Sequence, residues 1–404
     1  MTMISVAEAA NLVLAQAVGF GIETIPFLSA AGRRLACDIV ADRDLPPYDR
    51  VTMDGIAIRG AAFTAGKRSF VVRATIAAGD TPVQIDSDGD CIELMTGCAL
   101  PAGTDTVVRY EDIEIDGGIA TIVANTIKPG ANVHRRGTDK HAGETVVPVN
   151  TLVDAAVISM AASVGQADLQ VWKLPRVAIV STGNELVDVQ DTPGPYQIRR
   201  SNSYAIHTVL QQLSIAADMV HIPDEPSEST QRLGSLLSQY DAIILSGGVS
   251  MGRFDYVPQA LTALGVQMLF HKVSQRPGKP FWFGVYPVGG KAVFAFPGNP
   301  VSAFLCLYRY FIPWLKAGTG HADTRIPVAV LAADYIFQPP LTYFLQVHLS
   351  VSEAGQLFAT PVEGHGSGDF SNLVLANAFM ELPAEITNFK KGDIYPVWPF
   401  KPVF

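Results

Sequence analysis

Between residues 175 and 320, short runs of apolar residues alternate with amphipathic stretches of helical spacing. Such short apolar runs are typical of strands that are buried on both faces of a sheet. Their alternation with helices predicts βαβ units and a parallel sheet. The expected strands are 176–180, 218–222, 242–245, 266–271 and 292–296. The expected helices span 227–240 or begin at about residues 201, 255 and 300.

Two flanking regions, 43–135 and 325–404, carry the pattern of small β domains, in which short β-type runs are separated by Gly and Pro turns. By contrast, residues 1–42 predict a helix followed by a short extended segment, and the helix is amphipathic, with apolar positions at Ile4, Val6, Ala9, Leu12 and Val13. Residues 136–170 return to helix, including an alanine-rich apolar stretch at 153–164. The runs with the β pattern are 70–74, 106–110, 328–331, 345–348, 356–360 and 378–382.

The expected fold class is a multidomain protein of the α/β and β classes. A Rossmann-like α/β domain is accompanied by two small β domains and a mixed N-terminal domain. A chain of 404 residues is too long for one ordinary core, which agrees with several domains. The expected domains are 1–45 with 136–172 (mixed N-terminal), 46–135 (small β), 173–320 (α/β) and 321–404 (β-barrel-like).

Composition narrows the classes of function. Hydrophobic residues make up 48% of the chain and charged residues 17%, which suits a well-buried globular protein. The net charge of −9 argues against a general binder of nucleic acid or anionic membranes, so local groups must capture any anionic substrate. Four scattered cysteines without a Cys-x-x-Cys pair argue against a zinc site or a disulfide framework. They favour a reducing, cytoplasmic location.

The sequence predicts neither a targeting segment nor a membrane span. The N-terminal stretch has no positively charged start and carries Glu8, which does not fit a signal peptide. The most apolar later segment, 301–315, contains Arg309 and Pro313 and is too short to cross a bilayer. We therefore expect no membrane partner.

The stretch 242–256 holds the strongest candidate for a binding loop. A buried strand ends in Ser246-Gly247-Gly248-Val249-Ser250, and Asp255 follows at the start of the next expected helix. Ligands of open α/β sheets bind beyond the carboxyl ends of the strands. Glycines let backbone N–H groups approach an anion, and the serines add hydroxyl donors. An acid beside a phosphate loop suggests a metal ion, although Asp255 could instead be a helix N-cap.

Two other loops of the α/β region carry candidate ligands. Thr182, Gly183 and Glu185 follow the first expected strand and could contact a ligand or a metal, or form an ordinary turn. Arg276 and Lys279 flank a rigid Pro-Gly turn. This pair of cations suits an oxyanion, although a solvated hairpin tip is the alternative.

The loop after the last expected strand of the α/β region begins with Pro297. Asn299 fits the N-cap and Pro300 the first turn of the next helix, so a helix N-terminus would face the same ligand end of the sheet. In the last β domain, the loop 364–368 contains Ser367 and could close on a phosphate or form a long hairpin turn.

Two acids outside the α/β region also belong to the candidate set. Asp54 precedes Gly55 near the entry to the first β domain, where the pair taken alone predicts a turn. Asp139 ends the basic segment 134–139, which taken alone predicts a solvated loop. Neither residue points to a site without its context in the chain.

The order of these segments resembles the molybdopterin molybdenumtransferase family, which includes MoeA and the C-terminal domain of gephyrin. Each motif alone is weak, whereas the joint order and spacing are specific and cover nearly the whole chain. The matching segments are Met-Asp-Gly at 53–55, Met-Thr-Gly at 95–97, Arg-Arg-Gly-x-Asp at 135–139, Ser-Thr-Gly-x-Glu-Leu at 181–186, Ser-Gly-Gly-Val-Ser-Met-Gly at 246–252, Pro-Gly-Lys-Pro-Phe at 277–281 and Pro-Gly-Asn-Pro-Val-Ser-Ala at 297–303.

The resemblance implies an elongated homodimer, in which the α/β domain of one subunit faces the N-terminal domains of the other. The implied reaction inserts molybdenum from molybdate into adenylylated molybdopterin and releases AMP. A divalent cation, expected to be Mg²⁺, would assist. The implied partners are a molybdopterin adenylyltransferase and molybdoenzyme-maturation proteins, and neither nucleic acid nor a membrane is among them.

The resemblance also implies roles for individual residues. The implied catalytic residues are Asp54, Asp139, Glu185 and Asp255, and three of these (Asp54, Glu185 and Asp255) would hold the metal. Arg276 and Lys279 would bind molybdate. The implied contacts to the pterin nucleotide are Thr96, Thr182, Gly183, Ser246, Gly247, Gly248, Ser250, Pro297, Asn299, Pro300 and Ser367.

The chain departs from the family pattern at four of these places. Val51-Thr52 and Ile56 stand where the family has Ser-Ala and Tyr around Met-Asp-Gly. Asn184 and Arg253 stand where the family has acids, and Arg276 stands where it has lysine. Two alternatives to an active transferase therefore stay open. One is a non-catalytic or regulatory relative that binds the pterin nucleotide without inserting metal. The other is a general nucleotide-binding phosphotransferase, which the absence of a Walker-type loop disfavours.

Overall fold

The computed structural model describes residues 3–248, 256–321, 325–364, 368 and 370–402. The chain folds into two compact units. The first comprises residues 1–25, 32–36 and 170–404, and the second comprises residues 26–31 and 37–169. The two units are described in turn.

A mixed sheet forms the centre of the first unit, in the order β16-β13-β17-β21-β20-β18. Its first four strands and β18 run in one direction, as the sequence predicts, whereas β20 runs antiparallel to both of its neighbours, β21 and β18. The prediction of a wholly parallel sheet is therefore wrong at this edge, because the links around β20 are too short for a crossover helix. The strands are β13 (Val177–Thr182), β16 (Ala217–Ile222), β17 (Ala242–Ser246), β18 (Gln267–His271), β20 (Trp282–Tyr286) and β21 (Lys291–Phe296).

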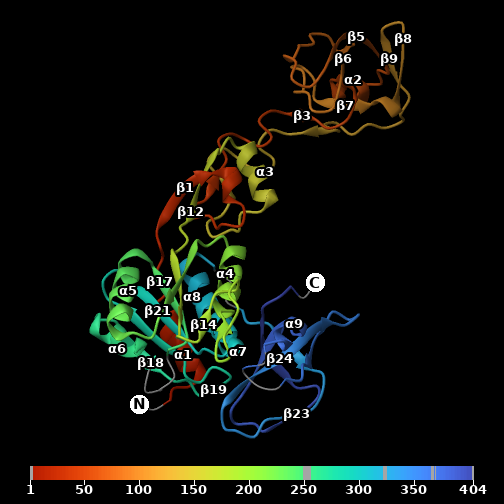
Figure 1. Cartoon of the computed structure of the whole chain (residues 1–404). Coiled ribbons are helices and arrows are strands. Elements are labelled where there is room, and N and C mark those ends of the chain that lie inside the picture. The colour runs from red at the N-terminus through yellow and green to blue at the C-terminus, as the bar shows by residue number, and fades with distance from the viewer. Residues whose placement is uncertain (1–2, 249–255, 322–324, 365–367, 369, 403–404) are drawn as a thin grey trace. The chain divides into compact units, whose positions relative to one another are not determined.

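Helices cover both faces of this sheet (Figure 1). Alternate residues of β13 separate the two cores: Val177 and Ile179 pack on one face, and Ala178 and Val180 on the other. The helices of the first face are α1 (Val6–Leu14), α4 (Asn202–Gln212), α7 (Pro300–Cys306) and α8 (Ile312–Gly318), with the π-helical turn η3 (Leu307–Phe311) between the last two. The helices of the second face are α5 (Pro226–Gln239) and α6 (Val257–Ala263).

Helix α6 starts later than expected, whereas helix α1 agrees with the expectation. Helix α6 begins at Val257 after the N-cap residue Tyr256, so the predicted start at residue 255 is too early. Pro258 lies in its first turn, where the missing N–H of proline costs nothing. Helix α1 places Val6, Ala9 and Val13 in the core of the α/β region. The amphipathic pattern of α1 was recognised in the sequence, but such a pattern does not name the surface that the helix covers.

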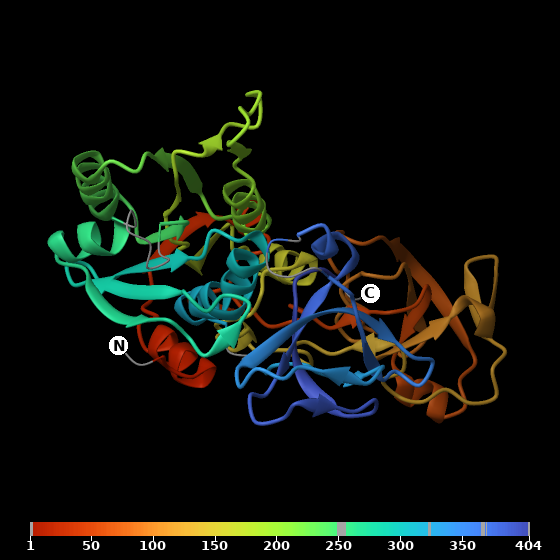
Figure 2. The ribbon, with the colours of Figure 1, turned by 60° about the horizontal axis from the view of Figure 1, so that its bottom comes forward.

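The C-terminal strands close into a small barrel (Figure 2). The order β24-β25-β22-β28-β26 returns to β24 through the pairing of β24 with β26, so these strands form a small β domain, as expected, with a closed sheet. Strand β19 (Gln275–Arg276) adds to this sheet beside β24, although it lies in the loop between β18 and β20. The other elements are β22 (Val328–Leu331), β23 (Tyr335–Ile336), β24 (Thr342–Val351), β25 (Leu357–Pro361), α9 (Asn372–Leu375), β26 (Ala378–Leu382), β27 (Asn388–Phe389) and β28 (Ile394–Pro399).

A largely buried ion pair joins the α/β region to this barrel. The Nε atom of Arg309 lies 3.0 Å from Oε2 of Glu381, and the Trp398 indole N–H donates to the same oxygen over 2.8 Å. The Arg309 side chain is only 9% exposed, and its guanidinium lies 4.3 Å from the ring centre of Trp398. Both partners of the carboxylate are thus fixed by packing.

We predict that Arg309→Met destabilises the protein by about 3 kcal/mol, because it leaves the mostly buried Glu381 carboxylate without its cation. Chemical denaturation followed by circular dichroism measures this loss. Lys390→Ala is the control, because it breaks the exposed pair of Lys390 with Asp334 and should cost less than about 1 kcal/mol. Equal losses in the two variants would contradict a structural role for the buried pair.

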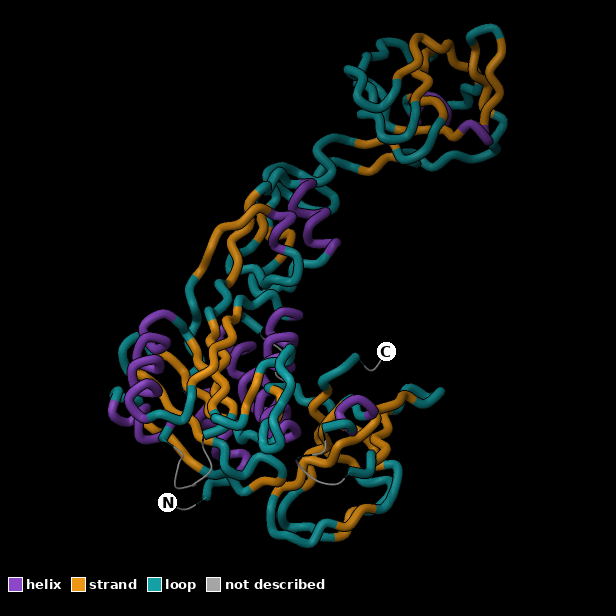
Figure 3. The backbone as a smooth tube through the Cα atoms, viewed as in Figure 1, coloured by secondary structure: helices purple, strands orange, loops and turns teal. Residues whose placement is uncertain are grey.

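An open six-stranded sheet with a core on each face dominates the second unit. Strand and loop make up most of it, with α2 (Gly60–Thr64) as a short helix (Figure 3). This confirms a small β domain, and the predicted runs 70–74 and 106–110 lie on its strands and the turn that follows. In sheet order, the strands are β7 (Thr106–Arg109), β4 (Gly55–Ile58), β6 (Asp90–Leu94), β5 (Ser69–Ile76), β9 (Ile119–Ile122) and β8 (Ile113–Asp116), with η2 (Tyr110–Asp112) before β8.

Short ribbons and one helix complete the chain. The expected helix at 153–164 is α3 (Ala155–Ser163), and Asp154 caps it by accepting the Val157 N–H over 2.9 Å. The two-stranded ribbons are β1 (Ile22–Pro26) with β12 (Asp168–Trp172), β2 (Ile39–Val40) with β11 (Thr145–Val147), and β3 (Arg50–Val51) with β10 (Val133–His134), and a 3-10 turn η1 spans Phe27–Ala30. The finer domain boundaries stay predictions. Along the residues that the structure describes, no helix combines the length and the apolar character that crossing a membrane requires.

Candidate functional site

Three neighbouring parallel strands end at the same edge of the central sheet. In the register of β13, β17 and β21, Ser181 lies beside Ser246, and Ser246 lies beside Phe296. The loops that follow the strands therefore meet, as the sequence predicts for the carboxyl ends of parallel strands.

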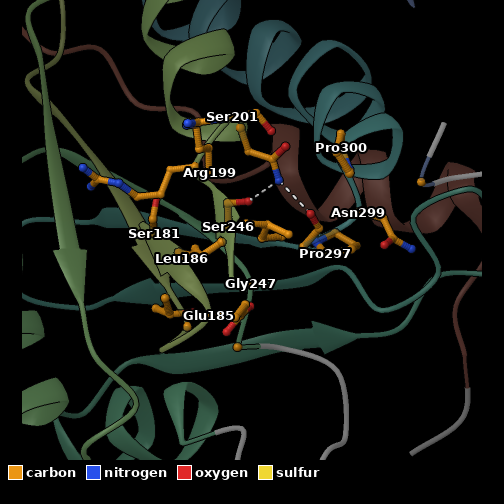
Figure 4. Close-up of a pocket in the computed structure, with 18 of the residues that line it drawn as sticks. Ser181, Glu185, Leu186, Arg199, Ser201, Ser246, Gly247, Pro297, Asn299 and Pro300 are labelled. Carbon is orange, nitrogen blue, oxygen red and sulfur yellow. Dashed lines mark hydrogen bonds between the residues drawn. The ribbon is translucent and has the colours of Figure 1, made fainter. Parts of the chain in front are cut away.

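These loops line a first cavity of about 1040 Å³ (Figure 4). Ser246 and Gly247 lie between the loop that carries Glu185 and the loop that carries Pro297 and Asn299. Of the predicted site residues that the structure describes, those that line the cavity are Thr182, Gly183, Glu185, Ser246, Gly247, Gly248, Pro297, Asn299 and Pro300. The expected residues Ser250, Asp255 and Ser367, and the departure at Arg253, lie outside the described residues.

Close packing of backbone against Thr182 explains the two glycines. Gly247 and Gly248 have φ angles of +96° and +69°. A Cβ on Gly248 would lie 2.7 Å from Thr182 Oγ1 and 2.8 Å from Val257 Cγ2, so no side chain fits there. Thr182 is only 4% exposed, and its Oγ1 has no hydrogen-bond partner among the described residues. Such a buried hydroxyl in a cavity wall is suited to a polar ligand atom.

Asn202 locks two of the loops together, and the sequence analysis did not single it out. Its Nδ2 donates to Ser246 Oγ and to the Gly298 carbonyl, each over 2.8 Å, along the dashed lines of Figure 4. The residue stands at the start of α4, where an asparagine alone suggests only a helix cap. The bonds fix the mouth of the cavity from the side of this helix.

Arginines supply positive charge that the sequence analysis also missed. Arg199 and Arg200 line the cavity. Arg199 ends the short strand β15 (Ile198–Arg199), which pairs with β14 (Leu186–Val187), and Arg200 follows it. Arg200 lies 2.6 Å from an Asp188 oxygen, and the Tyr204 hydroxyl donates to the same carboxylate. The Tyr204 bond first, and then the Val189 N–H and Arg200, hold the pKa of Asp188 below its usual range. Arg200 is thereby anchored beside a cavity suited to anions.

Two acids of the described part of the chain line the cavity, and only one of them was predicted. Glu185 folds back over Gly183, so that its carboxylate would lie within 2.6 Å of a Cβ on that glycine. Asp224 follows the end of β16, next to β13 in the sheet, which is a signal that sequence reasoning could have used. Asn184 and Asp224 each donate a backbone N–H to the other's side chain, over 3.3 and 3.1 Å. Asn184 thus joins the two loops without adding a second negative charge.

The acids in the wall of the first cavity can serve as ligands of a divalent cation. No cluster of three His, Cys, Asp or Glu side chains suited to a metal occurs among the residues that the structure describes. Mg²⁺, however, often binds through one or two carboxylates together with substrate phosphates and water. Glu185 and Asp224 in the cavity wall fit that mode of binding.

A second cavity of about 780 Å³ lies between the α/β region and the barrel and contains Arg276. The guanidinium lies 6.0 Å from the ring centre of Phe337, which stacks on Tyr343 at 4.1 Å. Arg276 belongs to β19 and pairs with Tyr343 of β24, while its side chain is exposed. Lys279 is exposed and is not among the lining residues of either cavity.

In the second unit, the predicted site residues Asp54 and Thr96 are in direct contact. Asp54 Oδ1 accepts the Thr96 N–H over 2.6 Å and the Thr96 hydroxyl over 2.8 Å. These two bonds hold the pKa of Asp54 below its usual range. The carboxylate is exposed and stays ionised in mildly acidic solution.

We predict that Thr96→Val raises the pKa of Asp54 toward the ordinary value, because the variant loses the hydroxyl donor and keeps the N–H. Bonds to the ionised form depress the pKa, so they are lost as the pH falls through the folded-state pKa. Carboxyl ¹³C NMR titration measures the change. Thr121→Val, which removes an exposed hydroxyl bonded to Ser69, should leave the Asp54 titration unchanged. An unchanged titration in Thr96→Val would contradict the assignment.

Asp139 lies in a chain of polar contacts within the same unit. Its Oδ1 lies 2.9 Å from His134 Nε2, and His134 Nδ1 lies 3.2 Å from an Arg50 nitrogen. Since Arg50 can only donate, His134 Nδ1 accepts and Nε2 carries the proton toward Asp139. The acid is therefore oriented by the basic segment in which the sequence analysis found it.

Comparison with protein families gives three matches that together span most of the chain. The MoeA N-terminal region (domains I and II) matches residues 4–165. The family described as "Probable molybdopterin binding domain" matches residues 178–317, and the MoeA C-terminal region (domain IV) matches residues 328–400.

Full-length relatives and solved structures agree with these matches. A molybdopterin molybdenumtransferase of Synechocystis is 35% identical over 98% of this chain and 100% of its own length, and one of Staphylococcus epidermidis is 30% identical over 98% and 95%. Two crystal structures of the molybdopterin biosynthesis protein MoeA from Pyrococcus horikoshii superpose with TM-scores of 0.85 and 0.82, at 27% and 25% identity, over 99% of this chain and 100% of theirs. The chain belongs to the MoeA family of molybdopterin molybdenumtransferases.

Proposed function

We propose that this protein completes the molybdenum cofactor by transferring molybdenum from molybdate to the dithiolene of adenylylated molybdopterin, with release of AMP. The first cavity is the observation that carries the proposal. It combines a glycine backbone packed against Thr182, a Thr182 hydroxyl that has no partner among the described residues, and the cations Arg199 and Arg200. A phosphate-bearing ligand needs N–H donors, hydroxyls and fixed positive charge in this form.

The pterin nucleotide would bind in the first cavity. Its phosphates would meet Thr182, Ser246 and the backbone of the glycine loop, and Arg199 and Arg200 line the same cavity. The N-terminus of α4 at Ser201 and Asn202 adds a favourable dipole, since the cavity reaches those residues. The volume of about 1040 Å³ is at the upper end of ordinary ligand pockets, which suits a substrate larger than a mononucleotide.

Magnesium would be held by Glu185 and Asp224 together with phosphate oxygens, with Asp255 as a further candidate ligand. When bound, the ion supplies charge neutralisation at the phosphoanhydride bond that is cleaved to free AMP. The residues of the cavity bind and orient the phosphates, and no protein nucleophile is needed for this cleavage.

Molybdate would bind near Arg276 and Lys279, in or beside the second cavity. The two cavities are lined by neighbouring residues of the same two loops. Pro280 lines the first cavity and Arg276 the second, and Pro300 lines the first and Val301 the second. An oxyanion at Arg276 would therefore lie next to a pterin nucleotide in the first cavity. A guanidinium fixed on an aromatic ring is suited to a dianion.

We predict that Lys279→Ala raises the molybdate concentration for half-maximal AMP release about tenfold, because one of two charge-assisted donors is lost. The concentration needed for the pterin nucleotide should stay unchanged. Lys316→Ala, which removes an exposed lysine from α8, should have wild-type kinetics. An unchanged molybdate dose response in Lys279→Ala would count against this role.

The acids of the second unit would complete the site in a homodimer. Asp54, oriented by Thr96, and Asp139, oriented by His134, would act on the substrate bound to the α/β region of the partner subunit. We propose that the dimer works in the cytoplasm, where it receives its substrate from a molybdopterin adenylyltransferase and passes the product to molybdoenzyme-maturation proteins.

Complementation tests the proposed function in cells. Bacteria that lack their own molybdopterin molybdenumtransferase should regain molybdoenzyme activity when they express this chain. A chain that is expressed in folded form and restores no activity, even with millimolar molybdate in the medium, would overturn the proposal. Restored activity that is lost again in Asp54→Ala would support the role of that acid.

A further inference from the structure

A buried polar cluster lies beneath the turn that carries Arg276 and Lys279. Gln275 has no exposed surface, and its Oε1 accepts the hydroxyl of Tyr310, which is 1% exposed. Its Nε2 donates to the Pro277 carbonyl over 3.1 Å and lies 3.9 Å from Cys306 Sγ. A buried amide costs free energy unless its polar atoms are paired, so the pairing of both atoms fixes this side chain.

The cluster fixes the backbone of the turn from below. Gly278 has a φ angle of +90°, and a Cβ there would lie 2.5 Å from Gln275 Nε2 and 3.2 Å from Cys306 Sγ. The turn is also closed by the Val273 N–H, which donates to the Lys279 carbonyl over 2.9 Å. The side chain of Gln275 thus lies against the stretch between the two cations, while the cations themselves are exposed.

We propose that Gln275 is a positioning residue for oxyanion binding, which sets the relative placement of Arg276 and Lys279 through the Pro277 carbonyl. This proposal rests on the proposed function, because it assumes that the two cations bind molybdate. A tetrahedral dianion is bound well only when its donors are held at a fixed separation, since mobile side chains lose conformational entropy on binding. Gln275 reaches neither cavity itself and acts through the turn.

Gln275→Met tests the proposal, because methionine fills a similar volume without the amide. We expect the molybdate concentration for half-maximal AMP release to rise about tenfold, with no change for the pterin nucleotide. Tyr310→Phe removes only the hydroxyl that holds Oε1 and should shift the molybdate response in the same direction by a smaller factor. Tyr395→Phe removes a barrel hydroxyl bonded to Asp393 and should leave the response unchanged.

The double variant Gln275→Met/Lys279→Ala separates positioning from general destabilisation. If Gln275 acts through the cations, its substitution should change molybdate dependence less than twofold once Lys279 is gone. The same tenfold effect in both backgrounds, or an equal effect on the pterin nucleotide, would overturn the proposal. Should Gln275→Met fail to fold, as judged by circular dichroism, Tyr310→Phe in the same two backgrounds decides.

Equilibrium dialysis with molybdate alone keeps this proposal apart from the proposed function. Wild-type protein that binds molybdate and releases no AMP contradicts the proposed function. Wild-type protein that releases AMP, together with Gln275→Met that binds molybdate with unchanged affinity, contradicts only the role of Gln275. Weaker binding in Gln275→Met, with no further loss in the double variant, supports the positioning role.

Discussion

Replacing Glu185 with Gln is expected to lower the rate of AMP release about 100-fold at saturating substrates. The amide keeps the shape of the side chain above Gly183 and removes the charge that would hold a divalent cation beside the phosphates. Pterin nucleotide binding in the absence of magnesium should persist, because the change removes a negative charge from an anion site. The magnesium concentration for half-maximal activity should rise in parallel.

Glu228→Gln is the matched control for this variant. Glu228 is a glutamate on α5 that pairs with Arg232 and does not line the first cavity. Its substitution should change neither the rate nor the magnesium dependence. A wild-type rate of AMP release in Glu185→Gln would rule out the assigned role. If excess magnesium fully restored the rate of Glu185→Gln, the role of Glu185 would be limited to holding the ion.

Gly248→Ala is expected to abolish tight binding of the pterin nucleotide. The new methyl group would lie 2.7 Å from Thr182 Oγ1 and 2.8 Å from Val257 Cγ2, so it pushes the loop away from the strand end. The φ angle of +69° adds a backbone cost of about 1–2 kcal/mol for alanine. Fluorescence or calorimetric titration with the nucleotide measures the loss of affinity.

Gly265→Ala is the control, because it also places alanine at a positive φ angle but causes no steric clash. Its φ angle is +87°, and a Cβ there meets no atom within 4 Å. Both variants should lose similar stability, whereas only Gly248→Ala should lose the ligand. Equal affinities in the two variants would show that the glycine loop does not approach the nucleotide.

Much of the α/β sheet could be predicted because its strands are buried on both faces. Such strands are apolar at every position and stand out in the sequence as short continuous apolar runs. The run at 242–245 became β17, flanked by two parallel strands as expected. Strand β20 (Trp282–Tyr286) was not predicted, because it forms a hairpin with β21 and no helix lies between the two strands. A pattern of alternating strands and helices does not indicate such a hairpin. The joining of β19 to the barrel depends on a long-range contact that no local pattern encodes.

Site residues were predictable where they follow a strand end and not where tertiary packing brings them in. The loops after β13, β17 and β21 were found because parallel strands present their carboxyl ends together. Asn202 lines the same cavity from the start of helix α4, and Arg200 lines it from the position after the two-residue strand β15. The sequence does not predict where these two elements lie relative to the sheet. Gln275 carries no sequence signal at all, because its importance lies in being buried and bonded beneath a turn.

The most direct test of the account is AMP release by the purified protein. The protein is incubated with adenylylated molybdopterin and magnesium, with or without molybdate, and AMP and protein-bound molybdenum are quantified together. We predict that AMP appears when molybdate is added, in an amount equal to the molybdenum inserted. Tight binding of the pterin nucleotide without release of AMP in the presence of molybdate would contradict the account and identify a non-catalytic relative instead.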